Sequence, residues 1–277
     1  MLSIKPLITP TLISKLFDRF PLLHYDSIQV QSPLDTSCNL LFIQSEEALE
    51  QKPSYDLESL RWQTYFIFSK IPHVLVPSTP YASSSNKLPF FIPSNSSIPF
   101  ALSSTEFQNW LLLQGVKDFS EKEPLLSADT DSYVSLVENT LYDAWYYGFF
   151  IEPENFKQVT SLLYIKDAWP ICIFTKWQFQ NQIRKKLSVR QKTGLLNAKE
   201  IYADASHALH ALSVKLGQDK WFFGAEDPSY IDATLFAYTH LVLSINLPDD
   251  TLAHEIKKHE NLVKHAERVL NICFPEK

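Results

Sequence analysis

Two histidines, one helical turn apart, come closest to a metal-binding pattern in this sequence. His207 and His210 would lie on one face of a helix, with Asp204 one turn earlier. No further ligand stands at a metal-binding spacing, and the chain has no Cys-x-x-Cys pair. We therefore expect no metal or other cofactor. The histidines should occupy the polar face of a helix whose apolar stripe is Ile201, Ala205, Ala208 and Leu212.

The remaining composition excludes several kinds of chemistry. The three cysteines, Cys38, Cys172 and Cys273, lie far apart among apolar residues, which predicts reduced, buried thiols in a cytosolic setting. Only five glycines stand against seventeen prolines, and neither G-x-G-x-x-G nor G-x-x-x-x-G-K occurs. Nucleotide chemistry of those kinds is therefore not expected. The net charge of -6 argues against nonspecific nucleic-acid binding.

One stretch carries a charge opposite to that of the whole chain. No acidic residue lies between Asp167 and Glu200, whereas seven basic residues do, interleaved with Trp169, Phe174, Trp177 and Phe179. A basic side chain near an anionic membrane contributes about 1 kcal/mol, and tryptophan favours the interface. We predict a patch for a membrane or partner, formed by Arg184, Lys185, Lys186, Arg190 and Lys192. The alternative is a solvated helix face whose aromatic residues belong to the core.

The clearest structural signal is the segment Trp-Phe-Phe-Gly-Ala-Glu-Asp-Pro-Ser-Tyr-Ile-Asp-Ala at 221–233. Gly224 belongs to a turn, and Ser229 is placed to cap a helix by accepting the N–H three residues on. Asp232 can return a bond to the Ser229 N–H and lies near the positive end of the helix dipole. We predict a buried helix from Tyr230 to about Leu247. Its most apolar part is shorter than the ~20 residues a membrane-spanning helix needs.

Short apolar runs in the first half predict strands. Residues 39–43 read as a strand buried on both faces of a mostly parallel sheet, and a helix should follow from about Asp56 to Ser69. Residues 73–76 and 88–92 should supply further strands. Pro89 opens the last one, where a missing N–H is tolerated.

The amino-terminal residues predict a short helix ahead of these strands. Thr9 and Pro10 suit its first positions, and Pro6 and Pro10 interrupt any secretory signal. Its apolar stripe must dock on the chain's own body or on a partner, and consists of Leu12, Ile13, Leu16, Phe17 and Phe20.

From Ser104 onward the pattern is helical. A first helix contains residues 107–112, and an acidic loop is expected over 117–131. The last helix, from Thr251 to Cys273, is expected to be amphipathic, with one face on the core.

These elements resemble those of glutathione-transferase-like proteins, in which a buried helix opened by Ser-x-x-Asp follows a Phe-Gly-x-x-x-Pro turn. The resemblance implies an α+β fold in which Pro89 is cis. An amino-terminal extension (1–37) would precede a thioredoxin-like α/β domain (38–103) and an all-helical carboxy-terminal domain (104–277).

Within that class the sequence resembles the metaxin family, whose members are subunits of the mitochondrial outer-membrane sorting and assembly machinery. The resemblance covers nearly the whole chain except 117–136, and the amino-terminal part looks like the smaller fungal member. The residues that carry it are Trp221 to Ala233, Pro248, Asn261-Leu262, Cys273-Phe274-Pro275, Leu16-Phe17-Asp18-x-Phe20-Pro21, Leu60-Arg61-Trp62-Gln63-Thr64 and Leu88-Pro89-Phe90.

This resemblance implies a non-catalytic protein on the cytosolic face of the mitochondrial outer membrane, in peripheral contact with the bilayer. Its partners would be a β-barrel channel subunit, a second metaxin-like subunit and β-barrel precursors. The physical task would be β-augmentation or hydrophobic capture of an extended precursor segment. We place the partner interface on the stripe residues Leu12, Leu16, Phe17 and Phe20.

The competing interpretation is a glutathione transferase or a glutathione-binding protein. Such an enzyme needs a hydroxyl or thiol just after the first strand, the backbone before the cis-proline, and an acidic or serine pair. Leu88-Pro89 and Ser103-Ser104 match the last two requirements. Ile43, however, is followed by Gln44, Ser45, Glu46 and Glu47, and Ser54 and Tyr55 come late. Two carboxylates there disfavour a thiolate.

Overall fold

The computed structural model describes residues 37–44, 52–83, 85–94, 102–103, 106–116, 124–165, 167, 169–191 and 194–275. The predicted amino-terminal helix, with Leu12, Leu16, Phe17 and Phe20, lies outside these residues. Lys192, Ser104 and residues 45–51 lie outside them as well. Side chains of residues 124–127 are not described.

A small mixed sheet forms the first part of the fold, with strand order β2-β1-β3-β4. The strands are β1 (Leu40–Ile43), β2 (Val74–Pro77), β3 (Phe90–Ile92) and β4 (Leu102–Ser103). β1 is buried throughout, as predicted. β1 pairs parallel with β2 but antiparallel with β3, so the prediction of a mostly parallel sheet was wrong. No α-helix lies between β2 and β3 in the described residues, and a parallel return would need such a crossover.

Strand β2 lies at one edge of this sheet. The N–H of Val74 donates to the carbonyl of Asn39 at 2.8 Å, and the N–H of Ser78 donates to that of Ile43 at 3.0 Å. Because backbone groups alternate along a strand, Leu75 and Pro77 direct theirs away from β1.

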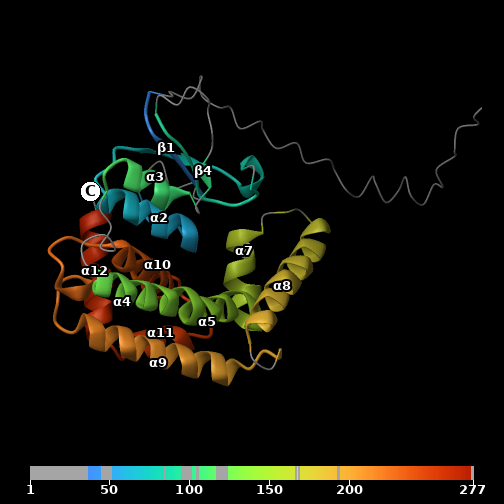
Figure 1. The fold of residues 1–277 in the computed structure, drawn as a ribbon. Coiled ribbons are helices and arrows are strands. Elements are labelled where there is room, and N and C mark those ends of the chain that lie inside the picture. The colour runs from blue at the N-terminus through green and yellow to red at the C-terminus, as the bar shows by residue number, and fades with distance from the viewer. Residues whose placement is uncertain are drawn as a thin grey trace, which may run out of the picture.

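Helix α2 (Leu57–Phe68) joins the sheet to the helical part of the molecule (Figure 1). Asp56 caps it by accepting the N–H of Ser59 at 2.9 Å, and Ser69 ends it, in agreement with the predicted bounds. One side of α2 contributes Leu60 to the core of the helical part. Another side packs under the sheet, in a cluster that includes Trp62, Phe66, Phe91 and Phe107 of α3 (Phe107–Leu113).

The helical part begins with α4 (Pro124–Leu136), so the predicted acidic loop ends earlier than expected. Three π-helical turns, Val137–Leu141, Tyr147–Ile151 and Phe156–Thr160, alternate with the short helices that follow. These short helices are α5 (Tyr142–Tyr146), α6 (Pro153–Asn155) and α7 (Ser161–Tyr164). The longer helices are α8 (Ile171–Arg190), α9 (Ala198–Leu216) and α10 (Tyr230–Ser244). Among the described helices, none combines the length and hydrophobicity that crossing a bilayer requires.

The predicted last helix is two helices, α11 (Thr251–Lys257) and α12 (Glu260–Cys273). His259 breaks the path with φ −111° and ψ 84°. The amide of Asn261 donates to the carbonyls of Ser213 and Gly217, at 2.8 and 3.1 Å, which fixes the start of α12 at the end of α9.

Helix α10 is buried on nearly all sides, as its all-round apolar sequence predicts, and it packs against α2 and α12. It ends at Ser244, shortly before the predicted Leu247.

The cysteines are free. Cys172 and Cys273 are half-buried, and burial raises the pKa of Cys273 to about 12, so this thiol stays protonated. Cys38 is exposed, which corrects the expectation that all three are buried.

Candidate functional site

The turn before α10 uses two consecutive residues in the left-handed region. Phe223 has φ 61° and Gly224 has φ 65°, which glycine adopts without strain. Ser229 and Asp232 then form a capping box. The N–H of Ser229 donates to Asp232 at 2.9 Å, and its Oγ donates to the same carboxylate at 2.8 Å.

Asp232 also has partners outside its own helix. Its carboxylate accepts the N–H of Phe222 at 3.1 Å and lies 2.9 Å from Nε2 of His265. Both side chains are completely buried. Sequence reasoning missed His265, although it lies between Leu262 and Val269 on the core face of α12, where a polar residue signals a buried partner. This cluster links the turn, α10 and α12, and Ser229 also lines the cavity described below.

The positions that bind glutathione in a transferase meet at one end of the sheet. The register places Phe42 opposite Phe90, and Phe90 opposite Ser103, so Ser103 lies level with Phe42, and Leu88 and Pro89 follow toward the end of β1. The Leu88-Pro89 bond is cis, as the resemblance implies.

Ser103 is already hydrogen-bonded within the chain. Its N–H and its Oγ both donate to the Glu106 carboxylate, at 2.8 and 2.7 Å. The Ser103 hydroxyl and N–H hold the pKa of Glu106 below its usual value, so this carboxylate is charged at neutral pH. Glu106 is therefore a charged residue beside Ser103 at this end of the sheet.

One of the candidate activating hydroxyls, that of Ser54, is also engaged within the chain. Ser54 is buried; its Oγ donates to the carbonyl of Gln44 at 2.9 Å, and its N–H donates to Gln63 at 3.1 Å. The backbone carbonyl of Tyr55 accepts a hydrogen bond from the Tyr164 hydroxyl, at 2.8 Å. Ser54 therefore serves to fix the path of the chain into α2.

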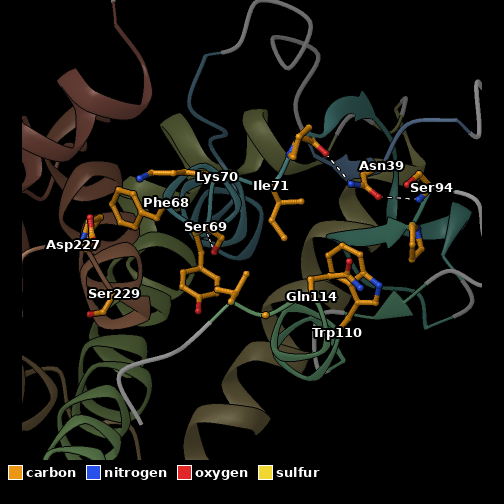
Figure 2. Close-up of a pocket in the computed structure, with 16 residues that line it drawn as sticks. Asn39, Phe68, Ser69, Lys70, Ile71, Ser94, Trp110, Gln114, Asp227 and Ser229 are labelled. Carbon is orange, nitrogen blue, oxygen red and sulfur yellow. Dashed lines mark hydrogen bonds between the residues drawn. The ribbon is translucent and has the colours of Figure 1, made fainter. Parts of the chain in front are cut away.

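A cavity of about 630 Å³ opens elsewhere, between α2, α3 and the loop before α10 (Figure 2). Asn39 and Ser94 mark its sheet side, and Lys70, Trp110 and Asp227 lie around it. Asn39 and Ser94 flank the pair Leu40–Ile92, at the opposite end of the sheet from Pro89. This cavity is therefore distinct from the transferase position.

The two histidines considered for metal binding, His207 and His210, are exposed on α9. The described residues contain no group of ligands that could hold a metal ion. The predicted stripe of Ile201, Ala205, Ala208 and Leu212 is buried.

Only part of helix α8 packs on the body of the molecule. Its second half is anchored to the body: Ile183 and Leu187 are buried, and Gln180 donates to the carbonyl of Phe150 at 2.9 Å. Phe179 packs on Phe150 with ring centroids 5.3 Å apart. Its first half projects from the body beside α7 (Figure 1).

The projecting half exposes large apolar side chains. Exposed fractions are 67% for Trp169, 63% for Ile171 and 61% for each of Ile173, Phe174 and Trp177. The rings of Phe174 and Trp177 lie 6.0 Å apart. The core assignment that we kept as the alternative therefore fails for Trp169, Phe174 and Trp177.

The structure divides the predicted basic patch. Lys186 contacts the Tyr142 hydroxyl, and Arg190 donates to Asp143 at 2.6 Å and to Asn139 at 2.9 Å. These two residues hold α8 against α5. Arg184 and Lys185 are exposed, whereas Lys192 lies outside the described residues. The predicted residues therefore do not form one outward patch.

Comparison with known proteins places this fold in a class. Glutathione S-transferase models match residues 57–155 for the N-terminal domain and 205–269 for the C-terminal domain. A solved glutathione transferase family member from Pseudomonas fluorescens, with two glutathione bound, aligns with a TM-score of 0.55 at 11% identity, over 87% of this chain and 95% of that chain. The protein has the glutathione-transferase-like fold, with a thioredoxin-like first part and a helical second part.

Sequence comparison points to one group within this class. The chain is 29% identical to metaxin-1 of Macaca fascicularis over 233 residues, which cover 80% of this chain and 72% of that protein. It is 30% identical to human metaxin-1 over 80% of this chain, but spans only 49% of that protein. These likenesses support the metaxin family.

Proposed function

We propose that the chain is a non-catalytic, metaxin-like subunit on the cytosolic face of the mitochondrial outer membrane. There it would help a sorting and assembly complex to receive β-barrel precursors and insert them. The similarity to metaxin-1 over 80% of the chain is the observation that carries this proposal.

The proposed partners are a β-barrel channel subunit, a second metaxin-like subunit and the precursors themselves. An unpaired barrel strand exposes backbone groups and an apolar face, which a partner can cover by β-augmentation or by hydrophobic capture. The apolar stripe of Leu12, Leu16, Phe17 and Phe20 is the proposed contact with a partner subunit.

The hydrogen bonding at the transferase position supports a non-catalytic role. Glu106 occupies the N–H and the Oγ donor of Ser103, while Ser54 is hydrogen-bonded to Gln44 and Gln63.

Co-purification tests the proposal. The affinity-tagged chain, expressed in mitochondria and solubilised with mild detergent, should co-purify with a membrane β-barrel and a second metaxin-like protein. A protein recovered alone, with no outer-membrane subunit, would contradict the assignment.

Glutathione binding is the second candidate, favoured by the position of Pro89 just before β3, beside the end of β1. We expect millimolar glutathione to leave the melting temperature unchanged, because a ligand well above its Kd must stabilise the protein by RT ln(1 + [L]/Kd). The same measurement on the Glu106→Gln variant tests whether the charge of Glu106 affects glutathione binding. A clear rise in melting temperature of the unaltered protein would revive the transferase interpretation.

A further inference from the structure

The first half of α8 carries an apolar surface at the most projecting part of the helix. We call Trp169, Ile171, Ile173, Phe174 and Trp177 the α8 tip; each is at least 61% exposed. Isolated exposed apolar residues need no explanation, but five large ones within nine consecutive positions form a patch that costs free energy in water.

The outward face of α8 continues from apolar to basic. At about 100° per residue, Phe174, Trp177, Arg184 and Lys185 all fall within one sector, away from the buried Ile183 and Leu187. Seven residues separate Trp177 from Arg184, which is about 10 Å along the helix. Lys186 and Arg190 lie on another side, toward α5.

No carboxylate offsets these charges within the helix. The sequence from 168 to 199 has no acidic residue, although the whole chain has a net charge of -6. The basic surface of α8 attracts an anionic partner, whereas the same partner repels the acidic remainder of the molecule. The charge distribution would therefore orient the chain with α8 toward that partner.

We propose that the α8 tip, with Arg184 and Lys185, binds the interfacial region of an anionic lipid bilayer. Amphipathic segments of peripheral proteins bury their apolar residues about 5 to 10 Å into the headgroup boundary, with lysine and arginine at the level of the headgroups. Arg184 lies about 10 Å along the helix from Trp177. A tilted helix can therefore bury Trp177 in the interface while Arg184 stays at the level of the headgroups. Tryptophan is the side chain most suited to that region.

The anchored half of the helix supports this role. Arg190 and Gln180 tie α8 to Asp143 and Phe150, so the tip is presented by a braced helix. Contact with lipid then needs no unfolding of the body. This binding is a property of the chain alone and does not depend on the proposed assembly complex.

Vesicle flotation of the purified full chain tests the proposal. Vesicles of phosphatidylcholine, with and without phosphatidylserine, are the probes. The protein should float with the anionic vesicles, and less so as salt rises. Phe174→Ser with Trp177→Ser should lower binding by about tenfold or more, because it removes two large apolar groups. Arg184→Gln with Lys185→Gln should lower binding to anionic vesicles by about tenfold, with little effect on neutral ones.

Matched variants control for hydrophobicity and charge elsewhere on the surface. Leu113→Ser with Val214→Ser removes exposed apolar residues of α3 and α9, and Lys257→Gln with Lys264→Gln removes exposed charges of α11 and α12. Both should bind vesicles like the unaltered protein. All variants should keep its melting temperature, since the altered residues are exposed.

Absence of vesicle binding by the unaltered chain would overturn the proposal, as would equal binding by the Phe174 and Trp177 variant. The α8 tip is a protein interface if the unaltered chain binds a purified partner subunit but no vesicles, and the Phe174 and Trp177 variant no longer binds that subunit. Failure to co-purify with a complex, with vesicle binding intact, would refute only the proposed function.

Discussion

At the scale of single residues, one carboxylate organises the entry into α10. Asp232 accepts from Phe222, from both donors of Ser229 and from His265, so it links the turn, the cap and α12. Buried carboxylates are costly unless each lone pair is used, and here the hydrogen bonds provide that compensation.

We therefore expect Asp232→Ala to lower the free energy of unfolding by about 3 kcal/mol or more, since it leaves several buried donors unpaired. Ser229→Ala should cost only about 0.5 to 2 kcal/mol, as for other N-caps. Urea unfolding monitored by tryptophan fluorescence measures both. Asp227→Ala, an exposed neighbour, is the control and should change little. Equal losses for Asp232 and Asp227 would refute the central role of the buried carboxylate.

The capping pair was accessible from the sequence because a cap is a local pattern, readable from residues three apart. His265 was not, because its contact with Asp232 joins residues 33 apart. The same limit explains Glu106: its bond to Ser103 is local, but its significance appears only when the register brings Ser103 beside Pro89.

At the scale of elements, α2 begins at a carboxylate that its surroundings keep partly protonated. Burial raises the pKa of Asp56 to about 6, against the opposing hydrogen bonds from Ser59. An acid whose pKa is higher in the folded state favours folding at low pH. Its contribution is therefore present below about pH 4 and lost as the pH rises through about 6.

Asp56→Asn removes this titration while keeping an N-cap side chain. The variant should gain stability relative to the unaltered protein between pH 4 and pH 7, with the change centred between the two pKa values. Urea unfolding of both proteins across this range gives the difference. A difference independent of pH would show that Asp56 does not titrate as described.

Helices with an uninterrupted helical pattern were predictable from the sequence. Helices interrupted by π-helical turns were not. The α2 bounds follow from Asp56 and Ser69, and α10 from its cap. Residues 137–160 contain three π-helical turns, each of which rotates the apolar pattern relative to an α-helix. The exposed aromatic residues of α8 agree with the predicted patch, but the contacts of Lys186 and Arg190 with α5 escaped prediction, because Tyr142 and Asp143 are distant in the sequence.

At the scale of the whole molecule, Arg61 connects the two parts. This largely buried residue of α2 pairs with Glu58 of its own helix and with Glu138 of the helical part. Its guanidinium also lies 5.5 Å from the ring centroid of Tyr230, which begins α10. Burial alone would lower the pKa of Arg61. Tyr230, Glu58 and Glu138 together raise this pKa by more than burial lowers it, so the guanidinium stays charged.

Arg61→Ala should destabilise the molecule by about 1.5 to 3 kcal/mol, the range for lost hydrogen bonds to charged groups, because the side chains of Glu58 and Glu138 that it leaves are 33% and 39% exposed. Arg61→Met should lose less, because it keeps the packing of the aliphatic stem. Thermal and urea unfolding measure the effect. Lys264→Gln breaks the exposed pair with Glu260 and should be nearly neutral. If Arg61→Ala is equally neutral, the two parts are held together by apolar packing alone.

Among the described strands, β2 has no neighbour on one side, and such an edge bears on self-association. An open sheet edge can recruit strands from other molecules and seed aggregates. Here Leu75 directs its N–H outward, but Pro77, the next outward residue, has none, and the strand ends there. The outward groups within β2 are therefore a single N–H, that of Leu75, and the carbonyls of Leu75 and Pro77. Among the described strands, the β2 edge is thus a poor template for the addition of further strands.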